Sequence, residues 1–392
     1  MLWGGQVNTP NLQKLLDAIN YQGVVTGYTH DAYRYPARFS PLFARAAIEL
    51  FTEPGDTVLD PFAGSCTSIV ECLASGRNAI GVDISPLAVF LGGVKTMLCN
   101  DRERDLILNW AIHIAPDLSP RLPVERHWEW KEAGYQQNLP WRFRKVAEQA
   151  INGAESLPAR LRPVARCIVL KTMQWAVDCK KHLPTAEDFR MRMIDNALSL
   201  IQGLESLKRQ VEDLNQGPVK IELLQGSADK ITMLPSELLK KAPPRLVITS
   251  PPYPGVHVLY HRWQVLGRKE TPAPFWIADC PDGQGSSFYT FGDRRNQRHE
   301  ELYFAELLAA FREIRKVIGN DAIVVQLVGF GSPETQLPLY IRTMKNAGFV
   351  EYEKEGHRRS HFWRSVPNRK WYTWLRSETK QTSEVLLIHR PD

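Results

Sequence analysis

The sequence has no apolar run long enough to cross a membrane. None of its hydrophobic stretches reaches the roughly eighteen residues that a transmembrane helix needs, so a membrane-spanning protein is excluded. Residues 1–10 hold no basic stretch followed by an apolar core, which argues against a secretory signal. The six cysteines stand at positions 66, 72, 99, 167, 179 and 280, without a C-x-x-C pair or a Cys/His cluster. A disulfide framework and a metal site are therefore not expected, and the thiols are typical of a reduced, cytoplasmic protein.

Two common nucleotide-binding motifs are missing as well, because neither G-x-x-x-x-G-K-[ST] nor G-x-G-x-x-G occurs. Neither sign of charge dominates the sequence, because 49 Lys and Arg against 43 Asp and Glu leave a net charge of only +6. This mild excess is compatible with a polyanionic partner but does not require one. Hydrophobic residues make up 43% of the 392 residues, an ordinary globular proportion in a chain longer than one average domain.

Short apolar segments alternate with helical patterns along most of the chain. Strands are expected at Thr57–Asp60, Ala79–Asp83, Val219–Gln225, Arg245–Thr249, Ala322–Leu327, Phe349–Glu353 and Glu384–His389. Helical patterns lie near residues 67–75, 301–317 and 335–346. This alternation predicts an α/β fold with a doubly wound, seven-stranded, mostly parallel sheet.

The stretch from Asn100 to Gly217 interrupts the alternation, since it holds little strand signal and much helical signal. Thr185 followed by Asp188 is typical of a helix start. Apolar residues then recur at helical spacing as far as Leu214, before Gly217 and a proline end the helix. We therefore expect residues 1–99 and 218–392 to form the two halves of the sheet domain, with residues 100–217 as a helical insertion.

A first candidate ligand loop, Asp60-Pro61-Phe62-Ala63-Gly64, lies between a predicted strand and a predicted helix. Small residues allow a tight turn, and a helix N-terminus offers unpaired N–H groups. The next strand ends at Asp83, whose carboxylate can accept both hydroxyls of a ribose. The acidic turn disfavours a phosphate and favours a cofactor that carries positive charge. Without a ligand, the same pattern would be an ordinary turn capped by Asp60.

A second candidate loop, Ser250-Pro251-Pro252-Tyr253, directly follows the predicted strand 245–249. Ligands of open α/β sheets bind beyond the carboxyl ends of the strands. Consecutive prolines stiffen the backbone and leave carbonyl groups free to accept hydrogen bonds. With a serine hydroxyl on one side and an aromatic face on the other, the loop forms a slot for a planar group bearing an amine. A rigid surface loop is the alternative interpretation.

The two loops together resemble the S-adenosylmethionine-dependent DNA amino-methyltransferases. The segment Tyr35-Pro36-Ala37-Arg38-Phe39-Ser40-Pro41 resembles the N-terminal cofactor motif of that family, and Asp229 resembles the acidic residue that meets the adenine of the cofactor. The serine that heads the tetrapeptide is similar to the cytosine-N4 group, whereas adenine-N6 members more often carry aspartate or asparagine there. The resemblance covers about residues 29–98 and 219–389.

This resemblance implies a class I methyltransferase-like fold, S-adenosylmethionine as cofactor and duplex DNA with a flipped base as partner. A restriction endonuclease is a further partner that the resemblance leaves open. Catalytic roles are implied for Ser250, Pro251, Pro252 and Tyr253. Cofactor contacts are implied for Tyr35, Phe39, Ser40, Asp60, Pro61, Phe62, Ala63, Gly64, Thr67, Asp83, Ile84 and Asp229.

Two departures from the family pattern stand out. Cys66 occupies the place of a second glycine in the cofactor turn, which predicts a turn of different shape. The helical insertion precedes both Asp229 and the Ser-Pro-Pro-Tyr loop, whereas target-recognition regions commonly follow one of them. The order of the segments therefore does not identify residues 100–217 as a target-recognition region. They remain a candidate DNA-recognition region because of their basic and aromatic composition.

The resemblance suggests a chemistry without a covalent nucleophile. Ser250 and the carbonyl of Pro251 would accept the N–H bonds of an exocyclic amine, while Tyr253 would stack on a base turned out of the helix. Methylation at carbon 5 of cytosine requires a cysteine after a proline, and the chain has no Pro-Cys pair. The leading hypothesis is cytosine-N4 methylation of DNA. The alternatives are adenine-N6 methylation, amino methylation of RNA, and a catalytically silent nucleic-acid-binding module.

Two basic segments contain many aromatic side chains and are candidate DNA contacts. Residues 121–181 carry a net charge of +6 with Trp128, Trp130, Tyr135, Trp141, Phe143 and Trp175, and residues 355–380 carry +5 with Phe362, Trp363, Trp371, Tyr372 and Trp374. Solvated basic faces over a core of tryptophans are the alternative. His257 and His261, just after the catalytic loop, face either the substrate or the protein interior.

Overall fold

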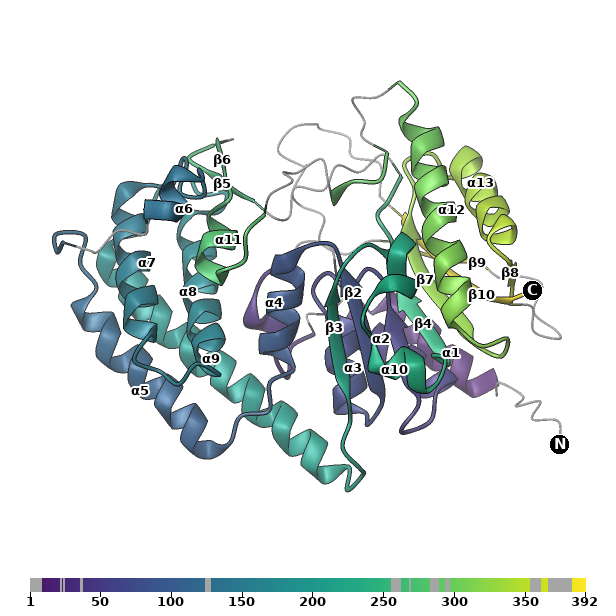
Figure 1. The fold of residues 1–392 in the computed structure, drawn as a ribbon, viewed down its shortest axis with the longest axis horizontal. Helices are drawn as coiled ribbons and strands as arrows, with labels where there is room; N and C mark the ends of the chain where they lie inside the picture. The colour runs from purple at the N-terminus through teal and green to yellow at the C-terminus, as the bar shows by residue number, and fades with distance from the viewer. Residues whose placement is uncertain are drawn as a thin grey trace.

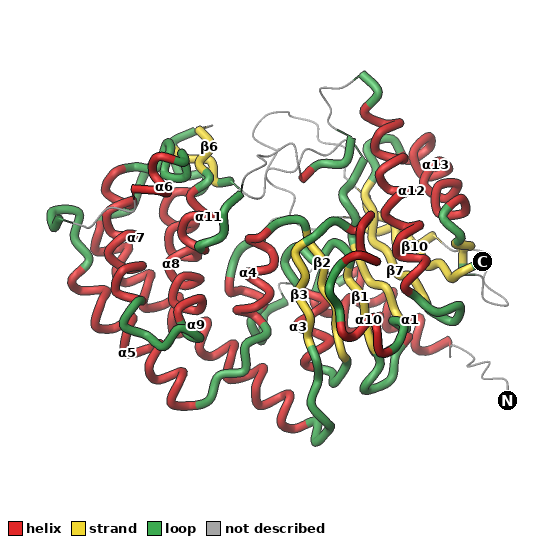
Figure 2. The backbone as a smooth tube through the Cα atoms, in the orientation of Figure 1, coloured by secondary structure: helices red, strands yellow, loops and turns green. Residues whose placement is uncertain are grey.

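A twisted eight-stranded sheet forms the centre of the computed structural model, which describes residues 9–21, 23, 25–35, 38–123, 128–254, 262–267, 269–282, 289–292, 297–352, 361–365 and 383–392 (Figures 1 and 2). Its strands are β1 (Thr57–Asp60), β2 (Asn78–Asp83), β3 (Ile221–Gln225), β4 (Leu246–Thr249), β7 (Ile323–Gly329), β8 (Phe349–Glu351), β9 (His361–Ser365) and β10 (Ser383–Pro391). Their order is β3-β2-β1-β4-β7-β10-β8, with β9 also paired to β10.

The five strands from β3 to β7 run parallel, and β10 is antiparallel to β7. The predicted α/β fold with a mostly parallel doubly wound sheet is confirmed, and each of the seven predicted strands lies in it. Strand β9 was not predicted. Its residues, His361 to Ser365, pair with the amino-terminal part of β10 while β8 pairs with the carboxyl-terminal part.

Alternate strand residues point to opposite faces of the sheet, and each face carries its own apolar core. Val58 and Ile248 pack with α1 (Thr9–Asn20), α2 (Pro41–Phe51) and α3 (Thr67–Ala74). Leu59 and Val247 pack on the other face. That face is covered by the 3-10 helix η2 (Ala228–Met233), α10 (Glu237–Lys241), α12 (His299–Val317) and α13 (Pro333–Asn346).

A helical unit lies beside the β3 edge of the sheet, on the left of Figure 1. It contains α5 (Asp101–Asp117), α6 (Trp128–Glu132), α7 (Trp141–Ala154), α8 (Arg162–Val177) and α9 (Ala186–Asp213), and α4 (Pro86–Lys95) leads into it. At the start of α9 the side chain of Thr185 accepts from the N–H of Asp188, whose carboxylate accepts from the N–H of Thr185 in turn. Among the described helices, none is both long and apolar enough to cross a membrane.

Residues that follow the Ser-Pro-Pro-Tyr loop also pack on the helical unit. They form the hairpin β5 (Trp263–Val265) and β6 (Lys269–Thr271) and the short helix α11 (Ala273–Ala278). Arg166 of α8 donates to the carbonyl oxygen of Ile277 (3.1 Å), and the N–H of Cys179 donates to that of Gln264 (2.7 Å). The helical unit is therefore assembled from two segments that are distant in the sequence, and it lies beside the β3 edge of the sheet.

Candidate active site

One cavity opens at the carboxyl ends of β1, β2, β3 and β4, where ligands of open α/β sheets bind. It encloses about 810 Å³ of empty space, its open mouth included. The residues that line it are Tyr35, Pro61, Phe62, Gly64, Asp83, Ile84, Gly226, Ser227, Ala228, Ser250, Pro251, Pro252, Tyr253, Tyr289 and Phe291. Both candidate loops from the sequence thus face the same space.

Asp83 is half-buried at the end of β2, on the wall next to residues 60–66, the candidate ligand loop after β1 (the cofactor loop). Its Oδ2 accepts from the backbone N–H of Gly64 (2.7 Å), and its Oδ1 accepts from that of Ser85 (2.8 Å). Burial raises the pKa of Asp83 to about 6, against the opposing effect of the two N–H donors. Each carboxylate oxygen retains a lone pair, so Asp83 can accept two further hydrogen bonds from a ligand in the cavity.

Asp60 is fully buried and lies behind the cavity wall, outside the set of lining residues. Its Oδ1 accepts from the hydroxyl of Thr249 (3.0 Å) and from the N–H of Phe62 (3.2 Å), and its Oδ2 accepts from Ser68. Burial raises the pKa of Asp60 to about 6. Because these bonds join β1, β4 and α3, Asp60 holds the base of the cofactor loop in place.

The cofactor loop turns through two left-handed residues, Gly64 (φ +47°) and Cys66 (φ +57°). A non-glycine residue in this conformation costs roughly 1 kcal/mol. The thiol of Cys66 points into the protein toward the carbonyl of Ala88, and a Cβ on Gly92 would lie 2.7 Å from its sulfur. Burial raises the pKa of this thiol to about 12, so it is unreactive. Cys66 therefore fits the turn because α4 carries a glycine opposite it.

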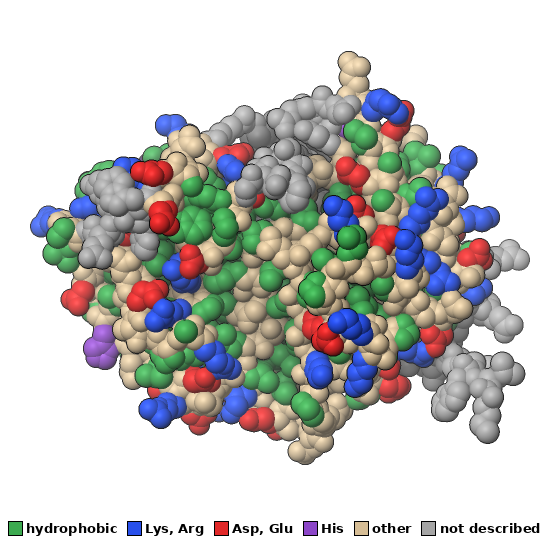
Figure 3. Space-filling model, viewed as in Figure 1, with side chains coloured by type: hydrophobic (Ala, Val, Ile, Leu, Met, Phe, Trp, Pro, Cys, Tyr) green, Lys and Arg blue, Asp and Glu red, His purple; other side chains and the backbone are tan. Residues whose placement is uncertain are grey.

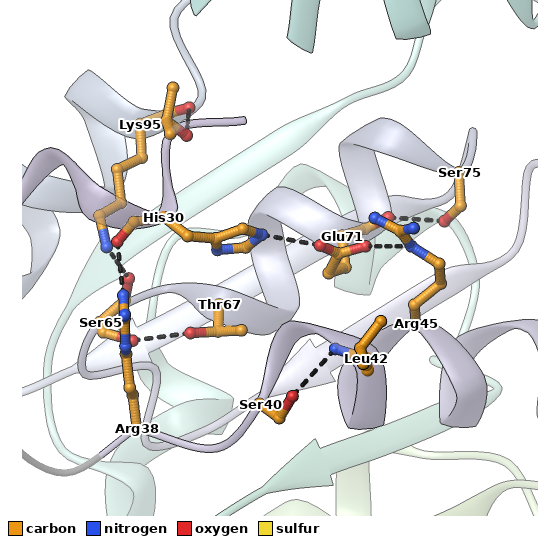
Figure 4. A network of polar contacts seen from close by, with 11 residues as sticks. His30, Arg38, Ser40, Leu42, Arg45, Ser65, Thr67, Glu71, Ser75 and Lys95 are labelled. Atoms are coloured by element: carbon orange, nitrogen blue, oxygen red, sulfur yellow. Dashed lines mark hydrogen bonds and ion pairs between the residues drawn. The ribbon is translucent and has the colours of Figure 1, made fainter. Parts of the chain in front are cut away.

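A network of polar contacts lies beside the cofactor loop (Figure 4). Lys95 of α4 donates to the carbonyl oxygen of Ser65 (2.7 Å), and burial lowers its pKa to about 8. The carboxylate of Glu71 contacts His30 (2.7 Å) and Arg45 (2.8 Å). Sequence reasoning missed these residues because each lies in a segment without a motif.

The Ser-Pro-Pro-Tyr loop forms the opposite wall. The hydroxyl of Ser250 lies 2.8 Å from the carbonyl oxygen of Leu327 and 3.1 Å from the hydroxyl of Tyr253. The carbonyl oxygen of Pro252 accepts from the hydroxyl of Tyr303 (2.8 Å), a buried residue of α12. The loop is thus held by the backbone of β7 and by a side chain of α12.

Several residues predicted to contact the cofactor do not line the cavity. Phe39 packs edge-on against Phe43 (5.4 Å between ring centroids), and Ser40 caps α2 through the N–H of Leu42 (3.3 Å). Ala63 and Thr67 are buried beside the loop. Asp229 is exposed, while its neighbour Ala228 lines the cavity.

Five lining residues were not predicted: Gly226, Ser227, Ala228, Tyr289 and Phe291. The ring of Phe291 contacts that of Phe62 edge-on (5.7 Å), and Tyr289 donates to Asp282 (2.6 Å). The first three are adjacent to Asp229, but nothing in the spacing of the two aromatic residues signals a site. His257, His261 and most of the basic segment 355–380 lie outside the described residues.

Asp83 is the sole charged side chain among the described lining residues, which include no lysine or arginine. An acidic, partly aromatic cavity suits a ligand with a ribose and a positive charge better than one with phosphates. The described residues contain no group of three His, Cys, Asp or Glu side chains that could hold a metal ion.

The sheet order, the antiparallel β10 and the cavity at the carboxyl edge define a class I methyltransferase fold. Residues 6–89 match the family model described as DNA methylase, whose members modify N6 or N4 amines. The recognition from the sequence is confirmed for this part of the chain, which is similar to the N4/N6 amino-methyltransferases. The family implies S-adenosylmethionine as methyl donor, which the composition of the cavity fits.

Individual relatives match short stretches only. The type II methyltransferase M.MjaII of Methanocaldococcus jannaschii is 36% identical over 18% of this chain and 13% of its own length. The DNA adenine methyltransferase YhdJ of Escherichia coli is 38% identical over 17% of this chain and 22% of its own length. The chain therefore covers less than a quarter of either relative. The structure of TrmN from Thermus thermophilus covers 93% of this chain and 52% of its own, with 10% identity and a TM-score of 0.34, too low to support an argument.

Proposed function

We propose that the protein is a DNA methyltransferase that transfers the methyl group of S-adenosylmethionine to the N4 amine of a flipped cytosine. The observation that carries this proposal is that Asp83 and the Ser-Pro-Pro-Tyr loop face one cavity from two walls. The serine at the head of that loop favours cytosine over adenine. A restriction endonuclease for the same DNA sequence is the second partner in this proposal.

In this proposal the cofactor occupies the side of the cavity formed by the cofactor loop. Asp83 accepts the ribose hydroxyls, and the aromatic rings of Tyr35 and Phe62 contact apolar parts. The cofactor supplies an activated methyl group on a sulfonium. Asp60, Thr67 and Ser40 act from behind the wall by fixing the loop and the start of α2.

The opposite side of the cavity would hold the target amine. Its lone pair is delocalised into the ring, which makes it a weak nucleophile. Acceptors at Ser250 and at the carbonyl of Pro251 would draw its hydrogens and localise the lone pair on nitrogen. The ring of Tyr253 lines the same space, so it can stack on a base that has left the duplex at a cost of a few kcal/mol.

Replacing Ser250 by alanine is expected to lower the rate of methyl transfer about tenfold to a hundredfold, because one N–H of the amine then lacks an acceptor. The measurement is transfer of labelled methyl groups to plasmid DNA, followed by mass spectrometry of the nucleosides. Ser206, exposed on α9, provides a control for the same substitution, and Ser206→Ala should match the wild-type protein. N4-methylcytosine in the product supports the proposal, whereas N6-methyladenine alone would establish the adenine alternative that YhdJ represents.

We further propose that the helical unit contacts DNA at the start of α7. Trp141 is 55% exposed there, with the guanidinium of Arg142 5.6 Å and the amine of Lys145 6.0 Å from its ring centroid. Asn138 donates to the carbonyl oxygen of Glu270 (2.8 Å), which puts this site next to the β5–β6 hairpin. On the face in Figure 3, acidic and basic side chains are interspersed over the helical unit, so the aromatic site is the more specific candidate.

Replacing Trp141 by alanine is expected to weaken DNA binding about tenfold by removing a stacking surface. Arg142→Gln should reduce the slope of log K against log salt by about one, since one phosphate contact is lost. Arg102→Gln is the matched control, because Arg102 is exposed in the first turn of α5, which begins at the far end of the helical unit (Figure 1). Fluorescence anisotropy with a labelled DNA duplex, repeated at several salt concentrations, measures both the affinity and its dependence on salt. Equal effects of Arg142→Gln and Arg102→Gln would contradict the assignment.

A further inference from the structure

A buried ion pair lies directly behind the Ser-Pro-Pro-Tyr loop. Arg364 of β9 and Glu384 of β10 are 7% and 6% exposed, and the guanidinium donates twice to Oε2 of the carboxylate (2.9 and 2.5 Å). The other oxygen, Oε1, lies 2.8 Å from the hydroxyl of Tyr253. None of the three residues is close to another in the sequence, and neither member of the ion pair was predicted to serve the site.

The ion pair determines the direction of the hydrogen bonds in this network. A carboxylate bound to a guanidinium accepts hydrogen bonds and donates none, so the hydroxyl of Tyr253 must donate to Glu384. Burial and the nearby carboxylate raise the pKa of Tyr253 well above its usual value, which keeps that hydrogen in place. The phenol oxygen is then an acceptor for Ser250.

Ser250 has a single hydrogen to donate, and both of its described partners can receive it. They are the hydroxyl of Tyr253 (3.1 Å) and the carbonyl oxygen of Leu327 (2.8 Å). Because that hydrogen is used inside the protein, Ser250 can offer a ligand in the cavity only its lone pairs. Without the ion pair, the hydroxyl of Tyr253 could turn and donate to Ser250, which would occupy a lone pair that Ser250 otherwise offers to a ligand.

We infer that Glu384, held by Arg364, is a positioning residue that makes Ser250 a hydrogen-bond acceptor toward the cavity. The catalytic slot therefore takes an amino group, which donates, and disfavours an oxo group, which would face another lone pair. Cytosine and adenine carry such an amino group, whereas thymine and uracil carry an oxygen in its place. This inference rests on the proposed function and extends it to the selection of the base.

A glycine makes room for the network. Gly329 of β7 pairs directly with Glu384 in the sheet, and a Cβ built on it would lie 2.8 Å from the ring of Tyr253. Any side chain at this position would push the tyrosine away from the carboxylate. Gly331, two residues further on, has no such neighbour, since the nearest atom to its Cβ would be 4.0 Å away.

The test begins with Glu384→Gln. The donors of Arg364 require the amide oxygen, so the amide N–H₂ would face Tyr253 and reverse the hydrogen bond. We expect kcat for methyl transfer to fall at least about tenfold, with cofactor affinity by calorimetry unchanged within about twofold. The matched control is Glu351→Gln, which changes a hydrogen-bonded contact with His361 away from the cavity and should leave kcat unaltered.

In Glu384→Gln the guanidinium of Arg364 is buried without a carboxylate, which could unfold the protein. Two further variants test the inference independently of that effect. Tyr253→Phe removes the hydroxyl but keeps the ion pair, and Gly329→Ala displaces the ring without removing any charge. Both should lower kcat about tenfold, with Gly331→Ala as the matched control for the second. In a Tyr253→Phe background, Glu384→Gln should cause no further loss, because Glu384 acts through that hydroxyl.

Wild-type kcat in Glu384→Gln or Gly329→Ala, or additive losses in the double variant, would overturn the inference while the proposed function stands. A wild-type protein that binds the cofactor but transfers no methyl group to DNA would overturn both. Losses in kcat that are confined to Tyr253→Phe, Glu384→Gln and Gly329→Ala, and that are not additive, support it.

Discussion

Asparagine in place of Asp83 is expected to weaken binding of S-adenosylmethionine by on the order of a hundredfold or more. The carboxylate accepts from Gly64 and Ser85 and has two lone pairs left for the ribose hydroxyls. Hydrogen bonds to a charged group contribute about 1.5–3 kcal/mol each. The amide N–H₂ of asparagine would also face one of the two backbone N–H groups, so the cofactor loop would lose its anchor as well.

Isothermal titration calorimetry with the cofactor measures this effect directly. Asp56→Asn is the control, because Asp56 makes a similar bond to the N–H of Glu53 (2.8 Å) at the opposite, amino end of β1. It should bind the cofactor as the wild-type protein does. Unchanged affinity in Asp83→Asn would show that the ligand of the cavity does not depend on this carboxylate.

The pKa of Asp83 also predicts how cofactor affinity depends on pH. In the free protein this carboxyl titrates at about 6, so it is ionised at pH 7.5 and largely protonated at pH 5. Ribose hydroxyls donate to the ionised form, and the affinity should therefore fall as the pH is lowered through about 6. The cofactor would in turn lower the pKa, so binding near pH 6 should release protons. Asp83→Asn should lose this part of the pH dependence, and a wild-type affinity that is flat from pH 7.5 to 5 would contradict the assignment.

Acidification is expected to destabilise the protein through His389 by about 2–3 kcal/mol between pH 7.5 and 4.5. His389 lies in β10 with 1% exposure, and both ring nitrogens are buried without a hydrogen-bond partner among the described residues. Burial lowers its pKa from 6.5 to about 4, against the attraction of Glu351. The folded state thus favours the neutral ring. Its contribution to stability is present above pH 6.5 and is lost as the pH falls toward 4, because the unfolded chain binds the proton first.

Urea unfolding of the wild-type protein and of His389→Leu, each at pH 7.5 and 4.5, isolates this contribution. Asp60 and Asp83, whose pKa values are raised to about 6, act in the opposite direction and favour the folded state at low pH. They are present in both proteins, so they cancel in the comparison. The leucine variant should lose about 2–3 kcal/mol less on acidification. His113→Leu, at an exposed position in α5, should lose as much stability on acidification as the wild-type protein. If this variant also lost about 2–3 kcal/mol less than the wild-type protein, the role of His389 would be refuted.

The sequence by itself determined seven of the eight strands of the central sheet and the two loops of the site. Short apolar segments bounded by turn residues predicted the seven strands from Thr57–Asp60 through Glu384–His389. A loop that follows such a strand lies at the carboxyl edge of the sheet. Local pattern placed Asp83 and Ser250 at the carboxyl ends of strands, the resemblance to the DNA amino-methyltransferases assigned them to one site, and both line the cavity.

Only the tertiary structure decided which of these residues reach the cavity and what stands behind them. Asp60 and Asp83 end neighbouring strands, yet bonds to Thr249 and Ser68 turn Asp60 away from the space that Asp83 lines. Glu384 reaches Tyr253 across 131 residues of sequence, because β10 pairs with β7 next to the catalytic loop. Strand pairing and side-chain direction depend on packing between distant segments, and no local pattern encodes such pairing.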